Sequence, residues 1–118
     1  MPAAPDPTVY PLDHLALRGK PDAPALVFKT HVLSYEALNQ RLGQLAAWLA
    51  AQIPEPGARV ATWLPKSELA CLMPLAAVRA GLVHVPVNPL LKRAQVAHIL
   101  GDSGARLLIA NAGRLATL

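Results

Sequence analysis

Apolar residues recur along this chain with two spacings, and these predict helices that alternate with short strands. In residues 34–52 the leucines return every three or four positions, at Leu38, Leu42, Leu45 and Leu49. That period is typical of an amphipathic helix with one buried face. Other segments are short and almost continuously apolar, as buried strands are, and these are residues 59–64, 83–87 and 106–110.

Capping residues mark where two of the helices begin. Ser34 and Ser67 can each accept a hydrogen bond from a backbone N–H of the first helical turn. Glu36 and Glu68 follow them and place a negative charge near the positive end of the helix dipole. The sequence therefore predicts a helix start at each serine.

The second of these helices should extend to Arg79 and stop at Gly81, and it is apolar nearly all round. We expect it to be buried on several sides, with Cys71 as a small buried hydrophobe. Pro74 lies inside it and lacks a backbone N–H, so we expect a kink or a division of the helix at that point.

The remaining segments complete the expected fold. They predict a short helix over residues 10–18, a small hairpin over residues 25–33, a further helix over residues 93–100 and a helical tail beyond residue 110. Residues 1–9 are rich in proline and should form a flexible leader, with one domain over residues 10–118. Because helices long enough for crossovers separate the apolar strands, these strands should pair in parallel with helices on both faces. The expected fold class is α/β, with a layered, mostly parallel sheet.

Composition narrows the classes of protein that fit this pattern. Hydrophobic residues make up 53% of the 118 positions and charged residues 15%, so we expect an apolar surface that the rest of a larger protein, or self-association, covers. The net charge of +4 comes from scattered Lys and Arg, which argues against nucleic-acid binding. The apolar runs are too short for a membrane span and residues 1–7 do not resemble a secretory signal, so the expected location is cytoplasmic.

The histidines and the cysteine do not form a recognisable site. The four histidines lack the spacing of a metal-binding pair, and Cys71 has no neighbouring ligand. The sequence therefore predicts neither a metal site nor a catalytic residue in this chain. His84, within an apolar strand, is interpreted as a core histidine with a backbone partner.

Three segments, in order along the chain, carry a more specific signal. Residues 33–38 read Leu-Ser-Tyr-Glu-Ala-Leu, residues 78–88 leave a helix at Ala-Gly and enter a strand that finishes in Pro-Val-Asn, and residues 101–110 read Gly-Asp-Ser-Gly-Ala-Arg-Leu-Leu-Ile-Ala. Together they resemble the opening portion of AMP-forming acyl-CoA ligases, within the wider family of adenylate-forming enzymes. Residues 63–67 are similar to that family's Leu-Pro-Asn-Ser turn, with Lys66 in place of the usual Asn. Capping and turn formation also explain residues 33–38, 63–67 and 78–88 structurally.

The resemblance implies a parent enzyme that activates a carboxylic acid with ATP as an acyl-adenylate, releases pyrophosphate and transfers the acyl group to the thiol of CoA. This chain would be an N-terminal scaffold fragment of that enzyme's large domain, and its main partner would be the rest of the enzyme. ATP, Mg²⁺ and CoA would be cofactors of the parent. The family's glycine-rich phosphate loop does not occur in this sequence, so we expect no cofactor in the fragment and no catalysis by the 118-residue chain alone.

Lys92 and Arg93 are the residues for which the resemblance implies a binding role. They follow Asn88-Pro89 in a region where some CoA ligases place a basic side chain near the nucleotide end of CoA. A contact with a CoA phosphate is therefore a hypothesis, and a solvated charge pair at a helix start is its alternative. Amino-acid-activating members of the family more often carry Asp at the position of Asn88, so Asn88-Pro89 favours an acyl- or aryl-CoA ligase.

Two other interpretations of the chain stay open. It could belong to an adenylation domain that loads a carrier protein, or it could be a stand-alone α/β binding module without chemistry. A cooperative monomer with a defined ligand would favour the module, whereas self-association through apolar surface would favour a fragment.

Overall fold

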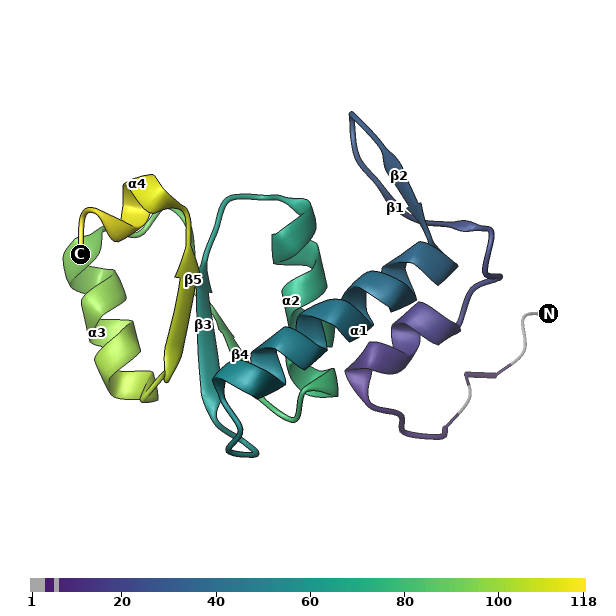
Figure 1. Ribbon diagram of the computed structural model, residues 1–118, viewed down its shortest axis with the longest axis horizontal. Helices are drawn as coiled ribbons and strands as arrows, with labels where there is room; N and C mark the ends of the chain where they lie inside the picture. Colours follow the sequence, from purple (N-terminus) through teal and green to yellow (C-terminus); the bar gives the residue numbers. More distant parts are fainter. Residues whose placement is uncertain (1–3, 6) are drawn as a thin grey trace.

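The computed structural model describes residues 4, 5 and 7–118, so residues 1–3 and 6 of the predicted leader lie outside the described part of the chain. Its centre is a parallel sheet in the order β4–β3–β5, built from β3 (Arg59–Trp63), β4 (Val83–Pro86) and β5 (Leu107–Ala110). Val60 of β3 lies opposite His84 of β4 on one side and Leu107 of β5 on the other. The predicted parallel pairing is confirmed, and β3 is the central strand (Figure 1).

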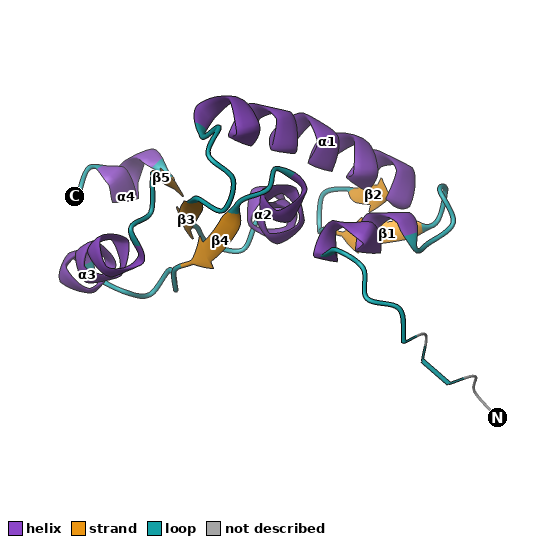
Figure 2. Ribbon diagram, turned by 90° about the horizontal axis from the view of Figure 1, so that it is seen from below, coloured by secondary structure: helices purple, strands orange, loops and turns teal. Residues whose placement is uncertain are grey.

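Helices cover both faces of this sheet (Figures 1 and 2). On one face lie α1 (Tyr35–Gln52), α2 (Glu68–Arg79) and the 3-10 helix η1 (Leu12–Leu17). On the other lie α3 (Arg93–Ser103) and the short α4 (Ala112–Leu115). An antiparallel hairpin of β1 (Pro24–Val27) and β2 (Val32–Ser34) packs separately against α1. The predicted α/β class, with helices on both faces of a parallel sheet, is confirmed.

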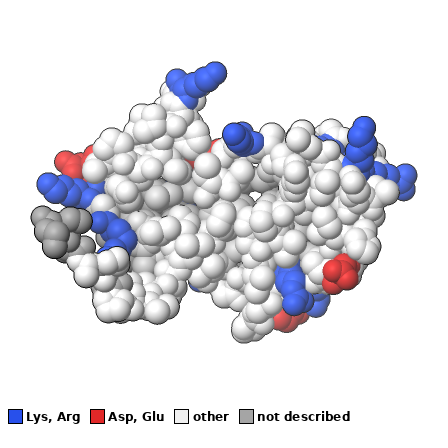
Figure 3. All heavy atoms as spheres, turned by 180° about the vertical axis from the view of Figure 1, so that it is seen from behind, with Lys and Arg blue, Asp and Glu red and all other residues white. Residues whose placement is uncertain are grey.

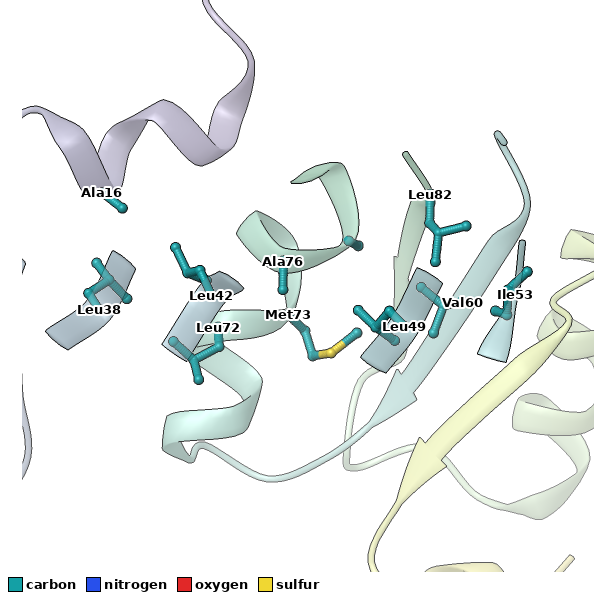
Figure 4. Packing of buried hydrophobic residues seen from close by; sticks show 11 residues of the cluster. Ala16, Leu38, Leu42, Leu49, Ile53, Val60, Leu72, Met73, Ala76 and Leu82 are labelled. Atoms are coloured by element: carbon teal, nitrogen blue, oxygen red, sulfur yellow. The ribbon is translucent and has the colours of Figure 1, made fainter. Parts of the chain in front are cut away.

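The alternation of side chains along β3 divides the core into two clusters. Val60 faces α1 and α2, where Leu49 and Met73 are fully buried in the same cluster (Figure 4). Trp63 points to the opposite face and packs with Val96 of α3. Successive residues of a strand point to opposite faces of its sheet. One central strand therefore supplies the contact surface for the helices on both sides.

The predicted helix starts are confirmed by their caps. The hydroxyl of Ser34 accepts a hydrogen bond from the backbone N–H of Ala37, and that of Ser67 from the N–H of Ala70, both at 3.1 Å. The leucine stripe of α1 faces the core, although Leu45 is only half-buried. Local spacing therefore predicted both the start of α1 and its buried face.

The second of the capped helices, α2, runs unbroken through Pro74, so of the predicted kink or division only the division is ruled out. It is also buried on one side only: Met73 and Ala77 have no exposed surface, whereas Cys71 is exposed. The prediction of a buried Cys71 is wrong, because its side chain lies about 200° around the helix axis from Met73, which is the side that faces α1 and the sheet.

The chain leaves more surface exposed than a compact protein of its size. Its accessible surface is 7725 Å², whereas a compact monomer of 12.5 kDa exposes about 6,200 Å². The molecule is elongated, with axes of 50, 34 and 32 Å. Charged side chains are sparse across much of one face (Figure 3). Leu15, Val27 and Leu90 are each more than half exposed, which agrees with the predicted apolar surface.

Candidate functional site at the carboxyl edge of the sheet

The three parallel strands end at the same edge of the sheet, where open α/β proteins commonly bind ligands. From β3 the chain continues into α2 on one face, and from β4 it continues into α3 on the opposite face. Adjacent strands whose connections go to opposite faces leave a crevice outside their carboxyl ends. This edge consists of the end of β3, the loop of residues 87–92 after β4, and the segment of residues 111–117 after β5.

A cavity of about 460 Å³ opens at this edge on the α3 side of the sheet. Apolar side chains and three cations line it, the residues being Trp63, Leu90, Leu91, Lys92, Arg93, Gly113, Arg114 and Thr117. None of these residues is Asp or Glu. Lysine and arginine without competing carboxylates, beside an apolar wall, are suited to bind an anionic group.

The two residues predicted from the sequence, Lys92 and Arg93, both lie at this cavity. Lys92 is the N-cap residue of α3 and Arg93 is its first residue, and both are exposed. Positive charge is unfavourable at this end of a helix dipole. The helix start is stabilised instead by Gln95, whose Oε1 accepts a hydrogen bond from the Lys92 N–H at 3.0 Å. A contact between these cations and a CoA phosphate stays a prediction.

Arg114, which the sequence did not single out, links the three strand ends. Its guanidinium lies over the ring of Trp63, 5.1 Å from the centroid, and it donates a hydrogen bond to the carbonyl oxygen of Pro89. The backbone N–H of Arg114 is held by the side chain of Asn111, the N-cap of α4, at 2.8 Å. The two contacts of the guanidinium join segments far apart in the sequence, so no local pattern indicates them.

The indole of Trp63 contributes a polar atom to the same region. Trp63 is 3% exposed, and its Nε1 has no hydrogen-bond partner among the described residues. A buried N–H without an acceptor costs about 1–3 kcal/mol.

A larger groove, of about 800 Å³, lies between η1, α2 and the outer edge of β4. Its walls are mostly apolar, and His84 is among them. The Nε2 atom of His84 forms a hydrogen bond with Oγ1 of Thr62 at 2.8 Å, and burial lowers the pKa of His84 below its ordinary value of 6.5. The predicted backbone partner is therefore wrong. The neighbouring strand places a threonine hydroxyl within reach on the same face.

Among the residues that the structure describes, no three side chains of His, Cys, Asp or Glu come together as metal ligands would. None of the described helices combines the length and the hydropathy that a membrane crossing requires.

Known proteins share both sequence and fold with this chain. The profile of the AMP-binding enzyme family matches residues 14–117. The L-proline-(L-prolyl-carrier protein) ligase of Pseudomonas fluorescens is 39% identical over 98 residues, which are 83% of this chain and 20% of that ligase. The N-terminal subdomain of NpsA from Klebsiella oxytoca, in complex with 3-hydroxyanthranilyl-AMSN, has a TM-score of 0.79 at 28% identity, covering 86% of this chain and 27% of that one. A benzoate CoA ligase from Burkholderia xenovorans shares the fold, with a TM-score of 0.83 at 22% identity over 93% of this chain and 23% of the ligase.

The chain spans about a fifth of the length of the proline ligase and about a quarter of the two solved structures. The family match nevertheless covers nearly the whole chain and includes all three segments that carry the resemblance. The predicted resemblance is thus confirmed, and the chain belongs to the AMP-binding enzyme family, among the adenylate-forming ligases and adenylation domains.

Proposed function

We propose that residues 10–118 are the N-terminal scaffold section of a larger ligase that activates a carboxylic acid with ATP and passes it to a thiol. The observation that carries this proposal is the family match over residues 14–117, on a fold shared with an adenylate-forming subdomain at a TM-score of 0.79. In such an enzyme the carboxylate displaces pyrophosphate from ATP to give an acyl-adenylate. The thiol then attacks the acyl carbon and AMP leaves.

ATP and Mg²⁺ do not fit the residues of this chain. Phosphate loops direct several backbone N–H groups at one point, usually through clustered glycines, and the glycines here are isolated. The described residues also lack a cluster of acidic or histidine side chains that would hold a metal ion. We therefore assign the adenylation chemistry to the remainder of the parent enzyme and a supporting role to this section.

The exposed surface of the chain supports a scaffold role. The excess over a compact monomer is about 1,500 Å², about twice the roughly 800 Å² that one partner buries in a protein–protein interface of standard size. The exposed apolar side chains and the elongated shape are consistent with a section that is completed by further structure. The rest of the parent enzyme is the partner that we propose for this surface, and an ATP-dependent enzyme of this kind would act in the cytoplasm.

For the thiol acceptor, the relatives favour a carrier protein. The curated ligase at 39% identity is named for a prolyl-carrier protein, and we infer the same class of acceptor here. CoA is the second candidate, because Asn88-Pro89 resembles the CoA ligases of the family. In either case Lys92 and Arg93, exposed beside a cavity without carboxylates, would hold negative charge of the acceptor.

The test is ATP–pyrophosphate exchange with a panel of carboxylic acids. We expect no exchange by the purified 118-residue chain and clear exchange by a longer protein that contains it. Thioester formation on CoA or on a carrier protein, followed by mass spectrometry, then identifies the acceptor. Exchange by the chain alone would contradict the scaffold role, and a longer protein inactive with every acid would contradict the proposed reaction.

A further inference from the structure

We propose that Arg114 is a positioning residue that fixes the loop of residues 88–92 against the sheet, and through it the two cations that face the acceptor. The inference rests on the proposed function and adds to it a residue outside the motifs that the family resemblance uses. Its basis is the set of contacts that meet at the carboxyl edge of the sheet.

The hydrogen bonds within the loop of residues 88–92 and the first turn of α3 shape the loop but do not reach the sheet. The side-chain oxygen of Asn88 accepts a hydrogen bond from the backbone N–H of Leu90 at 2.9 Å. The backbone carbonyl of Asn88 accepts another from the N–H of Leu91 at 3.1 Å. Lys92 bonds to Gln95 of α3. These bonds stay within the loop and the first turn of α3. They define a turn, and the packing of Leu91 against the cluster around Trp63 is the apolar contact of that turn with the sheet.

Arg114 adds a polar attachment to this apolar contact. Its hydrogen bond to the Pro89 carbonyl reaches the loop from α4, and its contact with Trp63 reaches the end of β3. A guanidinium can do both at once, because its flat face stacks on an aromatic ring while its N–H groups donate in the plane of the group. Lysine has neither the flat face nor the in-plane donors.

The loop that Arg114 holds carries the groups suited to contact an anionic acceptor. Leu90 is 84% exposed, and Lys92 and Arg93 are exposed beside it. A loop that is already ordered loses less conformational freedom when a partner binds. Freed from Arg114, the loop would keep its internal turn but would have to be ordered during binding. We expect an increase of about tenfold in the KM for the acceptor, since a hydrogen bond from a charged donor is lost.

The first experiment uses the 118-residue chain and its ¹H–¹⁵N spectrum. Arg114→Met keeps an unbranched side chain over Trp63 but removes the donor and the charge. We expect the Trp63 indole N–H and the amides of residues 88–92 to shift and broaden, with the two indole signals assigned through Trp48→Phe. Arg106→Met is the matched control, because Arg106 is an exposed cation whose nearest acid is the exposed Glu55 at 3.7 Å. If both variants leave the loop amides unchanged, the anchoring role is refuted.

The second experiment uses the longer protein and separates acceptor binding from adenylation. For Arg114→Met we expect the KM for the acceptor to rise about tenfold, while the KM for ATP in the exchange reaction changes less than twofold. Arg114→Lys should recover only part of the loss, and Arg106→Met should behave as the unmodified protein. An unchanged acceptor KM for Arg114→Met, or an equal rise for Arg106→Met, overturns the inference. Absence of exchange in the unmodified protein refutes the proposed function instead, and the spectra still decide whether Arg114 anchors the loop.

Discussion

Replacing Arg79 should make the chain unfold at a lower urea concentration, because this side chain ties α2 to both η1 and α1. Its Nε donates to Oδ2 of Asp13 at 3.0 Å, and its terminal nitrogens donate to the side-chain and backbone oxygens of Asn39 at 2.8 and 3.2 Å. The side chain of Arg79 is 22% exposed and that of Asp13 is 13% exposed. Without Arg79, the Asp13 carboxylate would remain largely buried and would lose the cation that pairs with it.

The expected loss follows from these contacts. A hydrogen bond to a charged group contributes about 1.5–3 kcal/mol, and breaking a buried ion pair costs about 3–5 kcal/mol. Because both groups retain some contact with water, we expect Arg79→Met to lower the free energy of unfolding by about 2–3 kcal/mol. Asp13→Asn should cost about 1 kcal/mol, since Arg79 keeps its bonds to Asn39. The double-mutant cycle should give a coupling energy of about 1–2 kcal/mol.

The pair of Arg41 and Glu68 provides a matched control. Its distance of 3.2 Å is similar, but the side chain of Arg41 is 50% exposed. Exposed pairs couple by about 0.2–1 kcal/mol, so this cycle should give clearly less than the cycle of Arg79 and Asp13. Urea unfolding followed by circular dichroism measures both. Equal coupling in the two cycles would show that burial does not set the strength of the contact, and the reasoning would be refuted.

Two further predictions concern packing and pH. Gly19→Ala should lower the melting temperature, because a Cβ at Gly19 would lie 2.2 Å from the ring of Tyr35, and overpacking of this kind costs about 1–3 kcal/mol. Gly113→Ala is the control, because the atom nearest to a Cβ at Gly113 would be 3.7 Å away, and its melting temperature should not change. An unchanged melting temperature for Gly19→Ala as well would refute the close contact with Tyr35. The free energy of unfolding should fall as the pH drops below 6.5, because burial depresses the pKa of His84 in the folded chain and the unfolded chain then takes up the proton first. The loss of unfolding free energy should be complete once the pH is below the pKa of His84 in the folded chain. Replacing the histidine, in His84→Gln, should remove this part of the pH dependence. If urea unfolding gives the same pH profile of stability for both proteins, His84 is not responsible.

The features that sequence reasoning predicted depend on residues close together in the chain. The cap at Ser34 and the leucine stripe of α1 each involve residues within a few turns of one helix, so spacing alone indicates them. Parallel pairing of β3, β4 and β5 also followed, because apolar runs separated by helices have few other ways to bury their side chains. The family resemblance was readable for a similar reason, since its motifs combine a helix end, a turn and a strand in contiguous segments.

The features that escaped prediction depend on side chains that meet across the fold. Arg114 contacts Trp63 and the loop after β4, and the sequence around Arg114 indicates neither contact. The case of Cys71 is different. A helix that is apolar nearly all round gives no indication of which side will face the core, so the exposed side of α2 could not be identified from periodicity. The candidate site was therefore predicted only in part, through the cations Lys92 and Arg93, and without the arginine that organises the loop.

The placement of β3 between two strands that follow it in the chain has a consequence during synthesis. β3 and β4 can pair as soon as residue 86 has emerged from the ribosome, with α2 already formed between them. The opposite edge of β3 stays unpaired until β5 has been synthesised. At a translation rate of 5–20 residues per second, adding residues 87–110 takes about 1–5 s. For that interval the nascent chain presents an open apolar strand edge, and we expect it to be most prone to bind chaperones or to misassemble then, before Leu107–Ala110 pairs with that edge.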